Sequence, residues 1–581
     1  MKKNNLENIR HSLAHLLAAA VLERFPGAKF GIGPVIENGF YYDFSLPRNL
    51  TPNDLKDFEG SMRKFIKDGL TFSGKKVAPA EARRIFKDQQ FKLELIKDFA
   101  HPPKGVKKQP LTVYKTGKIF LDLCRGGHVR NTKEINADAF KLVKIAGAYW
   151  KGDEKKPQLQ RVYGLAFNNK KELNEYLKMM EEAEKRDHRL LGQKLDLFSQ
   201  HEVSPGAIFW HPKGMVIWKE LENFIRQKNE ALNYGEVSTP VMVKKGLYEK
   251  SGHWQYYKEN GFWFDVDNET YVLKPMNCPE GTLIYSNVKR SYRDLPIKLA
   301  EPTGRLHRNE LRGVLGGLFR VRQFTQDDAH VFCRPDQIEQ EIFSLISYAK
   351  ELYKIVNMPI SFKLATKPDK AMGNPKLWTK AEQALKDVLK KLKIPYELKP
   401  KDGAFYGPKI DIHAKDAIGR EHQLSTIQLD FQMPERFKLE YTDEKGKPQR
   451  PIMIHRAILG SFERFIGVLI EHFAGDFPTW LSPVQVKILA VSDKQDAYAK
   501  DVFELLKNRG IRVELAPSNE TLGKRIREAE LEKVPYVLVV GDKEKSANTV
   551  SIRKRHIKDM IVESVPEFLD QIKKEINEKT A

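Results

Sequence analysis

The sequence predicts a multidomain α+β protein, with a central domain built on an antiparallel sheet between an N-terminal α+β domain and a C-terminal α/β domain. Two observations support this prediction. The chain has 581 residues, too many for one hydrophobic core. Its composition changes in a densely charged helical stretch near residue 185, and again in the segment 478–483, which starts and ends with proline. We therefore expect domains at residues 1–185, 186–480 and 481–581.

The first domain mixes helices with short strands. Residues 6–25 form an Ala/Leu-rich segment with helical spacing, and "KFGIGPVIENGFYYDFSL" predicts two strands that turn at Asn38 and Gly39. Residues 170–198 combine helical spacing with dense charge, which predicts a solvent-exposed helix that connects two domains. Residues 200–480 alternate long helices with strands bounded by glycine and proline.

The C-terminal part alternates strands and helices. We expect strands at 486–491, 511–515 and 535–540, helices at 494–508 and 521–532, and a turn at Gly541-Asp542. The strands are mostly apolar and alternate with helices, which predicts a largely buried sheet with helices packed on it.

The composition is that of a globular protein, with 41% apolar and 30% charged residues. No apolar run approaches the ~18 residues of a membrane helix, so we expect no membrane partner. The first 25 residues imitate a signal peptide, but two histidines and the pair Glu23-Arg24 favour an amphipathic helix. Three cysteines are too few for a disulfide framework and predict a cytoplasmic protein.

The net charge of +22 suggests a polyanionic partner, and nucleic acid is the first candidate. Residues 481–581 carry 19 Lys+Arg and 17 Asp+Glu, a balance of 19 − 17 = +2, so the first 480 residues hold the other +20. A general solubilising excess of basic residues is the alternative interpretation.

Two short segments carry potential zinc ligands. "HSLAH" places His11 and His15 on one face of a helix, and "LCRGGH" offers Cys124 and His128 at the same spacing. Thiol and imidazole groups are the ligands that Zn²⁺ prefers, so the residue count favours a zinc site. The alternative is a set of ordinary histidines at helical spacing.

Residues 305–333, "RLHRNELRGVLGGLFRVRQFTQDDAHVFC", form the most specific stretch. We expect Arg308 and Glu310 to alternate on one face of a strand, a loop around Gly313, Gly316 and Gly317, and a second strand carrying Arg320 and Arg322. A turn with Asp327, Asp328 and His330 follows. Guanidinium groups bind two phosphate oxygens at once, and a nearby carboxylate can accept from an exocyclic amine. The pattern predicts a nucleotide site on an antiparallel sheet rather than a salt-bridged surface hairpin.

Two further stretches are ambiguous when read alone. "IMIHRAILGSFERFIGVLIEHF", residues 452–473, predicts a strand of four residues leading into an amphipathic helix that contains Glu463 and Arg464. "KPMNCPEG", residues 274–281, holds Cys278, and a buried apolar thiol is the simplest interpretation of a lone cysteine.

Together these motifs resemble a known family. "LNYGEVSTP" ending at Pro240, the stretch around Arg308 and Glu310, and "GSFERFIG" are similar to motifs 1, 2 and 3 of class II aminoacyl-tRNA synthetases. "KPMNCP", "FTQDDAH", "GAFYGPKIDI" and "MIHRAILGS" resemble threonyl-tRNA synthetases in particular. "HSLAH" with "LCRGGH" is similar to the editing domain of that family, and "VPYVLVVGDKE" to its anticodon-binding domain. The resemblance covers nearly the whole chain.

The resemblance implies a class II antiparallel-sheet core, which binds ATP, Mg²⁺, one Zn²⁺ per catalytic site, L-threonine and tRNA(Thr). The implied zinc ligands are Cys278, His330 and His455. The implied ATP-binding residues are Arg308, Glu310, Arg320, Phe324 and Arg464, of which Arg308, Arg464 and also Lys409 are catalytic. The implied amino-acid-binding residues are Met276, Gln326, Asp328, Tyr406 and Gln428.

The resemblance also implies a second activity, because zinc should accept the hydroxyl of serine as readily as that of threonine. The N-terminal domain would hydrolyse seryl-tRNA(Thr), and the residues that match the family pattern are His11, His15, Lys92, Asp122, Cys124 and His128. Here the resemblance implies hydrolysis without a metal, whereas the ligand count favours zinc.

The chain departs from the family pattern in three places. It has Glu280-Gly281 where the family commonly has Gly-His, Leu315-Gly316 where a loop histidine is usual, and "RGGH" where "RGPH" is usual. The family's N-terminal ubiquitin-like domain is not expected. Motif 1 forms the dimer interface in this class, so we expect a homodimer.

Two other functions are compatible with parts of the sequence. One is a class II synthetase for another amino acid, such as serine or proline, but the Cys/His/His set combined with an editing domain is evidence against it. The other is a tRNA-binding regulatory paralogue without enzymatic activity. Such a protein should lose the motif arginines, whereas Arg308 and Arg464 are both present.

Overall fold

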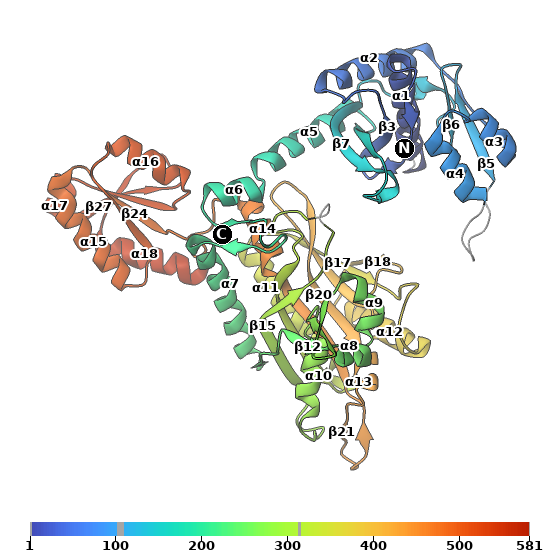
Figure 1. The fold of residues 1–581 in the computed structure, drawn as a ribbon. Coiled ribbons are helices and arrows are strands. Elements are labelled where there is room, and N and C mark those ends of the chain that lie inside the picture. Colours follow the sequence, from blue (N-terminus) through green and yellow to red (C-terminus); the bar gives the residue numbers. More distant parts are fainter. Residues whose placement is uncertain (1–2, 101–109, 312–314, 580–581) are drawn as a thin grey trace. The chain divides into compact units, whose positions relative to one another are not determined.

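The computed structural model describes residues 3–100, 110–311 and 315–579. These residues form two compact units that divide between Glu181 and Glu182 (Figure 1). Gly313 of the glycine-bearing loop lies outside the described residues. No helix in the described part of the chain is both long enough and apolar enough to cross a membrane.

The first unit contains two antiparallel sheets. A five-stranded sheet has the path β1-β3-β8-β7, with β2 paired to β3, and a three-stranded sheet has the order β4-β5-β6. Its strands are β1 (Lys29–Phe30), β2 (Val35–Ile36), β3 (Gly39–Ser45), β4 (Phe72–Val77), β5 (Leu111–Thr116), β6 (Phe120–Leu123), β7 (Phe140–Tyr149) and β8 (Gln158–Ala166). Its helices are α1 (Lys3–Arg24), α2 (Pro52–Asp68), α3 (Pro79–Ile85), α4 (Gln90–Ala100) and most of α5 (Lys170–Lys185).

Helix α1 lies within the core of this unit rather than on its surface. Leu13, Ala14, Leu17 and Ala18 are fully buried against strands of the larger sheet and α2. The predicted strand pair is present as β2 and β3, joined at Asn38.

The prediction of a single helix over residues 170–198 is wrong. This segment forms two helices, α5 and α6 (His188–Lys194), and residue 198 begins the strand β9 (Phe198–Ser199). The helical conformation is interrupted before Asp187, whose side chain accepts a hydrogen bond from the amide of Arg189 and so caps α6. A capping aspartate accepts a hydrogen bond from a free amide at the start of a helix. This bond favours the start of a new helix at Asp187 over the continuation of α5.

The second unit is built on an eight-stranded sheet with the order β11-β15-β16-β23-β20-β19-β17-β18. The pairs β11/β15 and β17/β18 are parallel and the other pairs are antiparallel. The eight strands are β11 (Gly235–Glu236), β15 (Ile297–His307), β16 (Gln323–Cys333), β17 (Ile360–Ala365), β18 (Tyr396–Lys399), β19 (Lys409–Lys415), β20 (Glu421–Asp430) and β23 (Ile452–Ser461).

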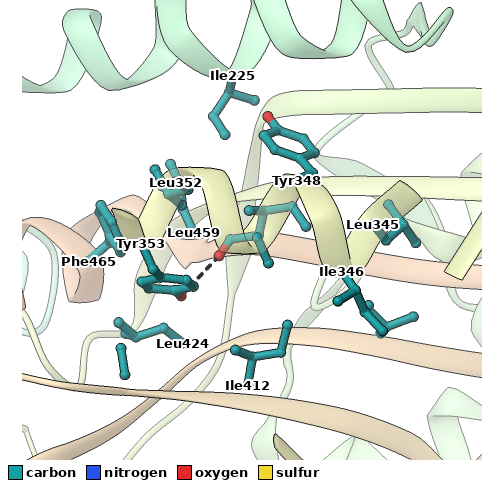
Figure 2. Close-up of a cluster of buried hydrophobic side chains, with 14 of the residues drawn as sticks. Ile225, Leu345, Ile346, Tyr348, Leu352, Tyr353, Ile412, Leu424, Leu459 and Phe465 are labelled. Atoms are coloured by element: carbon teal, nitrogen blue, oxygen red, sulfur yellow. Dashed lines mark hydrogen bonds between the residues drawn. The ribbon is translucent and has the colours of Figure 1, made fainter. Parts of the chain in front are cut away.

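The sheet carries helices on both faces. One face packs against α7 (Pro212–Ala231), α11 (Ile338–Ile355), α12 (Pro375–Lys391) and α14 (Phe462–Phe473), and Figure 2 shows Ile225, Leu352, Ile412, Leu459 and Phe465 in this layer. A smaller cluster on the other face joins α10 (Cys278–Ser286) and α13 (Gln432–Arg436) to Phe332 and Met453 of the sheet. The remaining small elements are α8 (Lys245–Ser251), α9 (His253–Tyr257), β10 (Phe209–Trp210), β12 (Met242–Lys244), β13 (Phe262–Val266), β14 (Glu269–Leu273), β21 (Tyr441–Thr442) and β22 (Pro448–Gln449).

Three local predictions for this unit are wrong. Arg308 and Glu310 follow the end of β15 instead of lying within a strand, and Arg320 and Arg322 precede β16. The predicted turn at Asp327–His330 is the middle of β16. The strand before Arg464 has ten residues instead of four, because β23 runs between β16 and β20 and pairs with both.

The C-terminal part contains a five-stranded sheet with the order β25-β24-β26-β27-β28. Its elements are β24 (Val486–Ala490), α15 (Asp496–Asn508), β25 (Val513–Ala516), α16 (Leu522–Leu531), β26 (Tyr536–Val540), α17 (Asp542–Ala547), β27 (Thr549–Lys554), β28 (Ile561–Ser564) and α18 (Val565–Glu578). Apolar residues of α15 and α18 pack on one face and those of α16 on the other, which confirms the predicted largely buried sheet. The predicted turn at Gly541-Asp542 is instead the start of α17.

Candidate functional site

The alternation of side chains along the central strands collects polar groups on one face of the large sheet. In β16, Ala329 and Val331 point into the helix-covered core, so Asp328 and His330 point to the opposite face. His330 pairs across the sheet with His455 of β23, which in turn pairs with Gln428 of β20. The strand register therefore brings together residues that are far apart in the sequence.

Cys278, His330 and His455 form a buried cluster on this face, and their possible ligand atoms all lie within 4.8 Å of one another. Burial raises the pKa of the Cys278 thiol well above its usual value and lowers the pKa of His330 well below its usual value. A sulfur and two ring nitrogens converging in a buried pocket fit Zn²⁺. The Nε2 atom of His455 lies 3.0 Å from a carboxylate oxygen of Asp430. Histidines that bind zinc through one ring nitrogen usually have such a partner for the other ring nitrogen.

Polar side chains predicted to bind the amino acid surround this cluster. The amide of Asn277 donates a hydrogen bond of 3.0 Å to Asp328, and the hydroxyl of Tyr406 donates one of 2.5 Å to Gln428. Burial raises the pKa of Asp328, although the bond from Asn277 opposes this shift. Lys409 pairs across the sheet with Gln428, and its ammonium group lies 2.6 Å from a carboxylate oxygen of Asp411.

Sequence reasoning missed four residues of this site: Asn277, His253, Asp411 and Asp430. The Nε2 atom of His253 lies 3.6 Å from the sulfur of Cys278. Asn277 belongs to the quoted stretch "KPMNCPEG", so its position next to Cys278 could have identified it. His253 and Asp430 are distant in sequence from the motifs, and no spacing pattern pointed to them.

The loop between β15 and β16 holds three of the predicted ATP-binding residues, Arg308, Glu310 and Arg320, and Phe324 follows at the start of β16. Arg308 lies above the ring of Phe324, 5.1 Å from its centroid, and one of its nitrogens lies 3.2 Å from the sulfur of Met276. Glu310 forms an ion pair of 2.8 Å with Arg320. The loop therefore presents guanidinium groups and a carboxylate beside the aromatic ring of Phe324 in β16.

Helix α14 contributes Arg464 from its first turn. Burial lowers the pKa of this guanidinium, and one of its outer nitrogens donates to the carbonyl of Phe319 at 3.4 Å. Its buried Nε atom has no hydrogen-bond partner among the described residues. A half-buried cation whose buried Nε donor is unsatisfied is suited to an anionic ligand.

Glu463, the neighbour of Arg464, leads to a prediction about pH. Its side chain is buried (4% exposed), and burial raises its pKa to about 8. The hydrogen bond that it accepts from the amide of Thr325 lowers the pKa and so opposes part of this shift. Its usual pKa is 4.5, so between pH 4.5 and about 8 the folded state holds a proton that the unfolded state releases. The carboxyl therefore contributes stability at low pH that is lost as the pH rises through this window.

We expect Glu463→Gln to become progressively more stable than the wild type as the pH rises. The gain is at most about 1.4 kcal/mol per pH unit. The melting temperatures of both proteins at pH 5.5 and 7.5 test this, with the exposed Glu435→Gln as a control. A difference between Glu463→Gln and wild type that stays constant over this range would contradict a raised pKa.

A second cluster lies in the N-terminal unit, where α1 and the loop after β6 meet. Possible ligand atoms of His11, His15, Cys124 and His128 all lie within 4.8 Å of one another. The sulfur of Cys124 is 3.4 Å from a ring nitrogen of His11 and 3.2 Å from one of His128. The two halves of the predicted set, over a hundred residues apart in sequence, are therefore adjacent.

Asp122 and Lys92 extend this cluster into a buried network. They form an ion pair, and His15 lies 3.7 Å from the same carboxylate. Tyr42, which sequence reasoning missed, donates a hydrogen bond of 2.6 Å to Asp122 and accepts one of 3.0 Å from Lys92. Its position in β3 within an apolar strand gave no signal of a polar role.

The second cluster borders a cavity of about 450 Å³, whose lining includes His11, Lys92, Asp122 and Cys124. Burial lowers the pKa of His11, His15 and His128, and it raises the pKa of the Cys124 thiol to about 12. The imidazoles are therefore neutral at pH 7 and can accept hydrogen bonds. These donors fit zinc by type, and they equally fit a site that orients a water molecule.

The loop that carries this cluster differs from the usual family pattern at Gly127. Its φ of +87° lies in the left-handed region. Proline has a φ fixed near −65°, so a proline at this position could not adopt this conformation. The glycine of "RGGH" is therefore compatible with the backbone conformation next to His128, whereas the proline of the usual "RGPH" is not.

The arginine-bearing loop between two antiparallel strands and the Arg464 helix after a third define the core of a class II aminoacyl-tRNA synthetase. The family model described as "tRNA synthetase class II core domain (G, H, P, S and T)" matches residues 262–473. The model "Anticodon binding domain" matches residues 485–575. The model "Threonyl and Alanyl tRNA synthetase second additional domain" matches residues 111–163.

Individual relatives are more specific than these models. A threonine–tRNA ligase of Carboxydothermus hydrogenoformans is 48% identical over 572 residues, which cover 98% of this chain and 89% of that protein. A threonine–tRNA ligase of Caldanaerobacter subterraneus is 49% identical over 571 residues, which cover 98% of this chain and 87% of that protein. This chain belongs to the threonine–tRNA ligase family of enzymes.

Solved structures agree with this assignment. The RNA binding domain of threonyl-tRNA synthetase from Cryptosporidium parvum is 43% identical, with a TM-score of 0.65, and the match covers 67% of this chain and 98% of that one. A putative threonyl-tRNA synthetase from Aeropyrum pernix is 26% identical with a TM-score of 0.59, and the match covers 68% of this chain and 97% of that one.

Proposed function

We propose that this protein activates L-threonine with ATP, transfers it to tRNA(Thr), and hydrolyses seryl-tRNA(Thr) formed in error. The observation that carries the proposal is the position of Asp328, His330 and His455 on the sheet face that also receives Cys278, in a chain of the threonine–tRNA ligase family.

In the activation step, a carboxylate oxygen of threonine attacks the α-phosphorus of ATP, and the bond to pyrophosphate breaks. Arg308 holds the α-phosphate and the charge that develops on it, and Arg464 and Arg320 contact other phosphates. Glu310 accepts from the adenine amine and Phe324 stacks on the ring. Mg²⁺ supplies further charge neutralisation when bound with ATP. Such a reaction is accelerated mainly by positioning and charge stabilisation.

Glu310 must exchange one interaction for another in this scheme. Its carboxylate is paired with Arg320 in the structure, and Arg320 is about half exposed. A partly exposed ion pair contributes little free energy, so exchanging it for bonds to adenine and phosphate costs little. Lys409 lies beside Gln428, where it can contact the carboxylate of threonine or the α-phosphate.

Threonine recognition depends on the polar face of the sheet. Cys278, His330 and His455 would hold Zn²⁺, which when bound supplies a Lewis acid for the amino and hydroxyl groups of threonine. Asp328, held by Asn277, reads the hydroxyl, while Met276, Gln326, Tyr406 and Gln428 surround the amino acid. Valine lacks the hydroxyl, and packing alone would reject it by only ~1–3 kcal/mol.

Serine retains the hydroxyl and lacks only a methyl group, so this site cannot exclude it by the same means. We propose that the second cluster performs the correction by hydrolysing the ester bond of seryl-tRNA(Thr). His11, His15, His128 and Cys124 orient the water, and one of the neutral imidazoles accepts its proton. The ammonium group of Lys92, held by Asp122, stabilises the negative charge that develops at the ester. Burial lowers the pKa of His11 and His15, so these rings are neutral and can accept hydrogen bonds from the water, while the same shift makes them weaker bases.

We also propose a homodimer formed through the motif 1 region around α7 and β11, and domains that divide at residues 185 and 480. The division of the structure after Glu181 and the family match that begins at residue 485 support these boundaries.

The test of the proposed threonine site compares Cys278→Ala with Cys333→Ala. Both cysteines are buried, and only Cys278 belongs to the histidine cluster. We expect Cys278→Ala to lose bound zinc and at least ~10²-fold of threonine-dependent ATP–pyrophosphate exchange. Cys333→Ala should keep both. A Cys278→Ala protein that still favours threonine over valine would refute this assignment of the site.

A further inference from the structure

A third cluster of possible ligand atoms consists of Asp187, His188 and Glu471, of which His188 and Glu471 are buried. His188 belongs to α6, the short helix after α5, and Glu471 belongs to the last turn of α14. The side chains of His188 and Glu471 are about 4–5% exposed. Neither residue takes part in the proposed reaction, although α14 also carries Arg464.

The interactions in this cluster are unsuited to a metal. Glu471 lies 2.6 Å from the ring of His188 and 2.6 Å from the guanidinium of Arg420. Asp187 is paired with Arg189. Two guanidinium groups already balance the two carboxylates, so the cluster offers no uncompensated negative charge to a cation.

The hydrogen bonds of His188 fix its tautomer. Its Nε2 atom accepts a bond of 2.9 Å from the backbone amide of Leu318, so this nitrogen carries no proton. Its proton is therefore on Nδ1, which donates to Glu471 at 2.6 Å. The imidazole thus bridges the end of α14 and the segment of the motif 2 loop that precedes β16.

The same ring holds the loop in place by packing. The ring of Phe319 lies 4.2 Å from that of His188, centroid to centroid. Gly317 has a φ of +58°, and a Cβ atom there would lie only 2.2 Å from Nε2 of His188. On the other side, a Cβ atom on Gly467 of α14 would lie 3.0 Å from Leu318. Residues 317–319 are therefore held between α6 and α14.

This segment continues directly into the ATP-binding residues. The carbonyl of Phe319 accepts the bond from Arg464, and the next residue, Arg320, pairs with Glu310. Any displacement of residues 317–319 would therefore move the hydrogen-bond partners of two residues proposed to contact ATP.

We infer that His188 is a positioning residue for ATP, which sets the motif 2 loop against Arg464 by accepting the hydrogen bond of the Leu318 amide. This inference rests on the proposed ATP-binding roles of Arg464 and Glu310.

The test separates the two bonds of the ring. His188→Gln can place its amide oxygen where Nε2 was and keep the bond from Leu318. His188→Asn can place its amide nitrogen where Nδ1 was, which keeps the bond to Glu471 and loses the bond from Leu318. We expect His188→Asn to raise the KM for ATP about 10-fold or more in threonine-dependent pyrophosphate exchange, because a buried amide loses its partner. His188→Gln should remain within about 3-fold of the wild type.

A purely structural role would give a different result. It would lower the fraction of active sites, counted by the burst of adenylate formed, and leave the KM for ATP unchanged in both variants. That result would overturn the inference, as would equal KM values for the Asn and Gln variants.

The glycines of the loop give an independent pair of variants if His188→Asn does not fold. Gly317→Ala should raise the KM for ATP, because its Cβ would meet His188 and its φ is positive. In Gly316→Ala the added Cβ has nothing within 4 Å, so this variant should keep the wild-type KM for ATP. Equal KM values for these two variants would count against the inference. Arg464→Ala provides the reference: an unchanged KM for ATP in that variant would refute the proposed ATP site itself.

Discussion

Arg308→Ala is expected to lower threonyl-adenylate formation by roughly 10³-fold or more, the loss typical when one positioned charge or donor is removed from such a transition state. The structure places this guanidinium between Phe324 and Met276, at the junction of the loop and the predicted amino-acid pocket. The measurement is the single-turnover rate of adenylate formation with saturating ATP and threonine.

Arg305→Ala is the matched control for this prediction. Arg305 lies three residues earlier, in β15, and is exposed. We expect its single-turnover rate to stay within about 2-fold of the wild type, since exposed substitutions away from a site have small effects. A rate for Arg308→Ala within 10-fold of the wild type would remove this arginine from the reaction.

His11→Ala and Cys124→Ala are expected to slow the hydrolysis of seryl-tRNA(Thr) by at least ~10²-fold, the usual contribution of a positioned acid or base. Both residues are only partly buried, so neither substitution leaves a large cavity in the core. Each belongs to the first compact unit, whereas the proposed activation site belongs to the second. Threonine-dependent pyrophosphate exchange should therefore stay unchanged in both variants.

Lys118→Ala is a suitable control for the editing variants, because Lys118 is exposed in the same unit. The measurement is the decay of preformed seryl-tRNA(Thr) mixed with each protein. Persistent hydrolysis in both His11→Ala and Cys124→Ala would place the hydrolytic site elsewhere. Hydrolysis that requires added zinc would instead favour the metal-binding interpretation of this cluster.

The composition of both sites was largely predictable from short motifs. "HSLAH" and "LCRGGH" each carry half of the N-terminal cluster, and the contact between the halves depends on α1 being buried beside β6. Cys278, His330 and His455 could not be joined by spacing, because each comes from a different element. The pairing of His330 with His455 across two strands is a property of sheet register, which no local pattern encodes.

The sequence was less informative about backbone detail. Alternating Arg308 and Glu310 suggested a strand, but β15 ends at His307 and the two residues enter the loop. The sequence predicts only four residues of the ten-residue strand β23, because its apolar residues fit a helix equally well. Residues that act as partners of motif residues, such as Tyr42 and Asp430, were missed because they contribute one side chain each from distant strands.

The most direct test of the proposed activity is the charging of tRNA(Thr) by the wild-type protein with threonine, serine, valine or proline supplied separately. We expect a stable threonyl-tRNA, a seryl-tRNA that remains below a few per cent at the end point, and no valyl or prolyl product. Stable accumulation of seryl-tRNA would contradict the editing role, and charging with proline or valine comparable to threonine would contradict the substrate assignment.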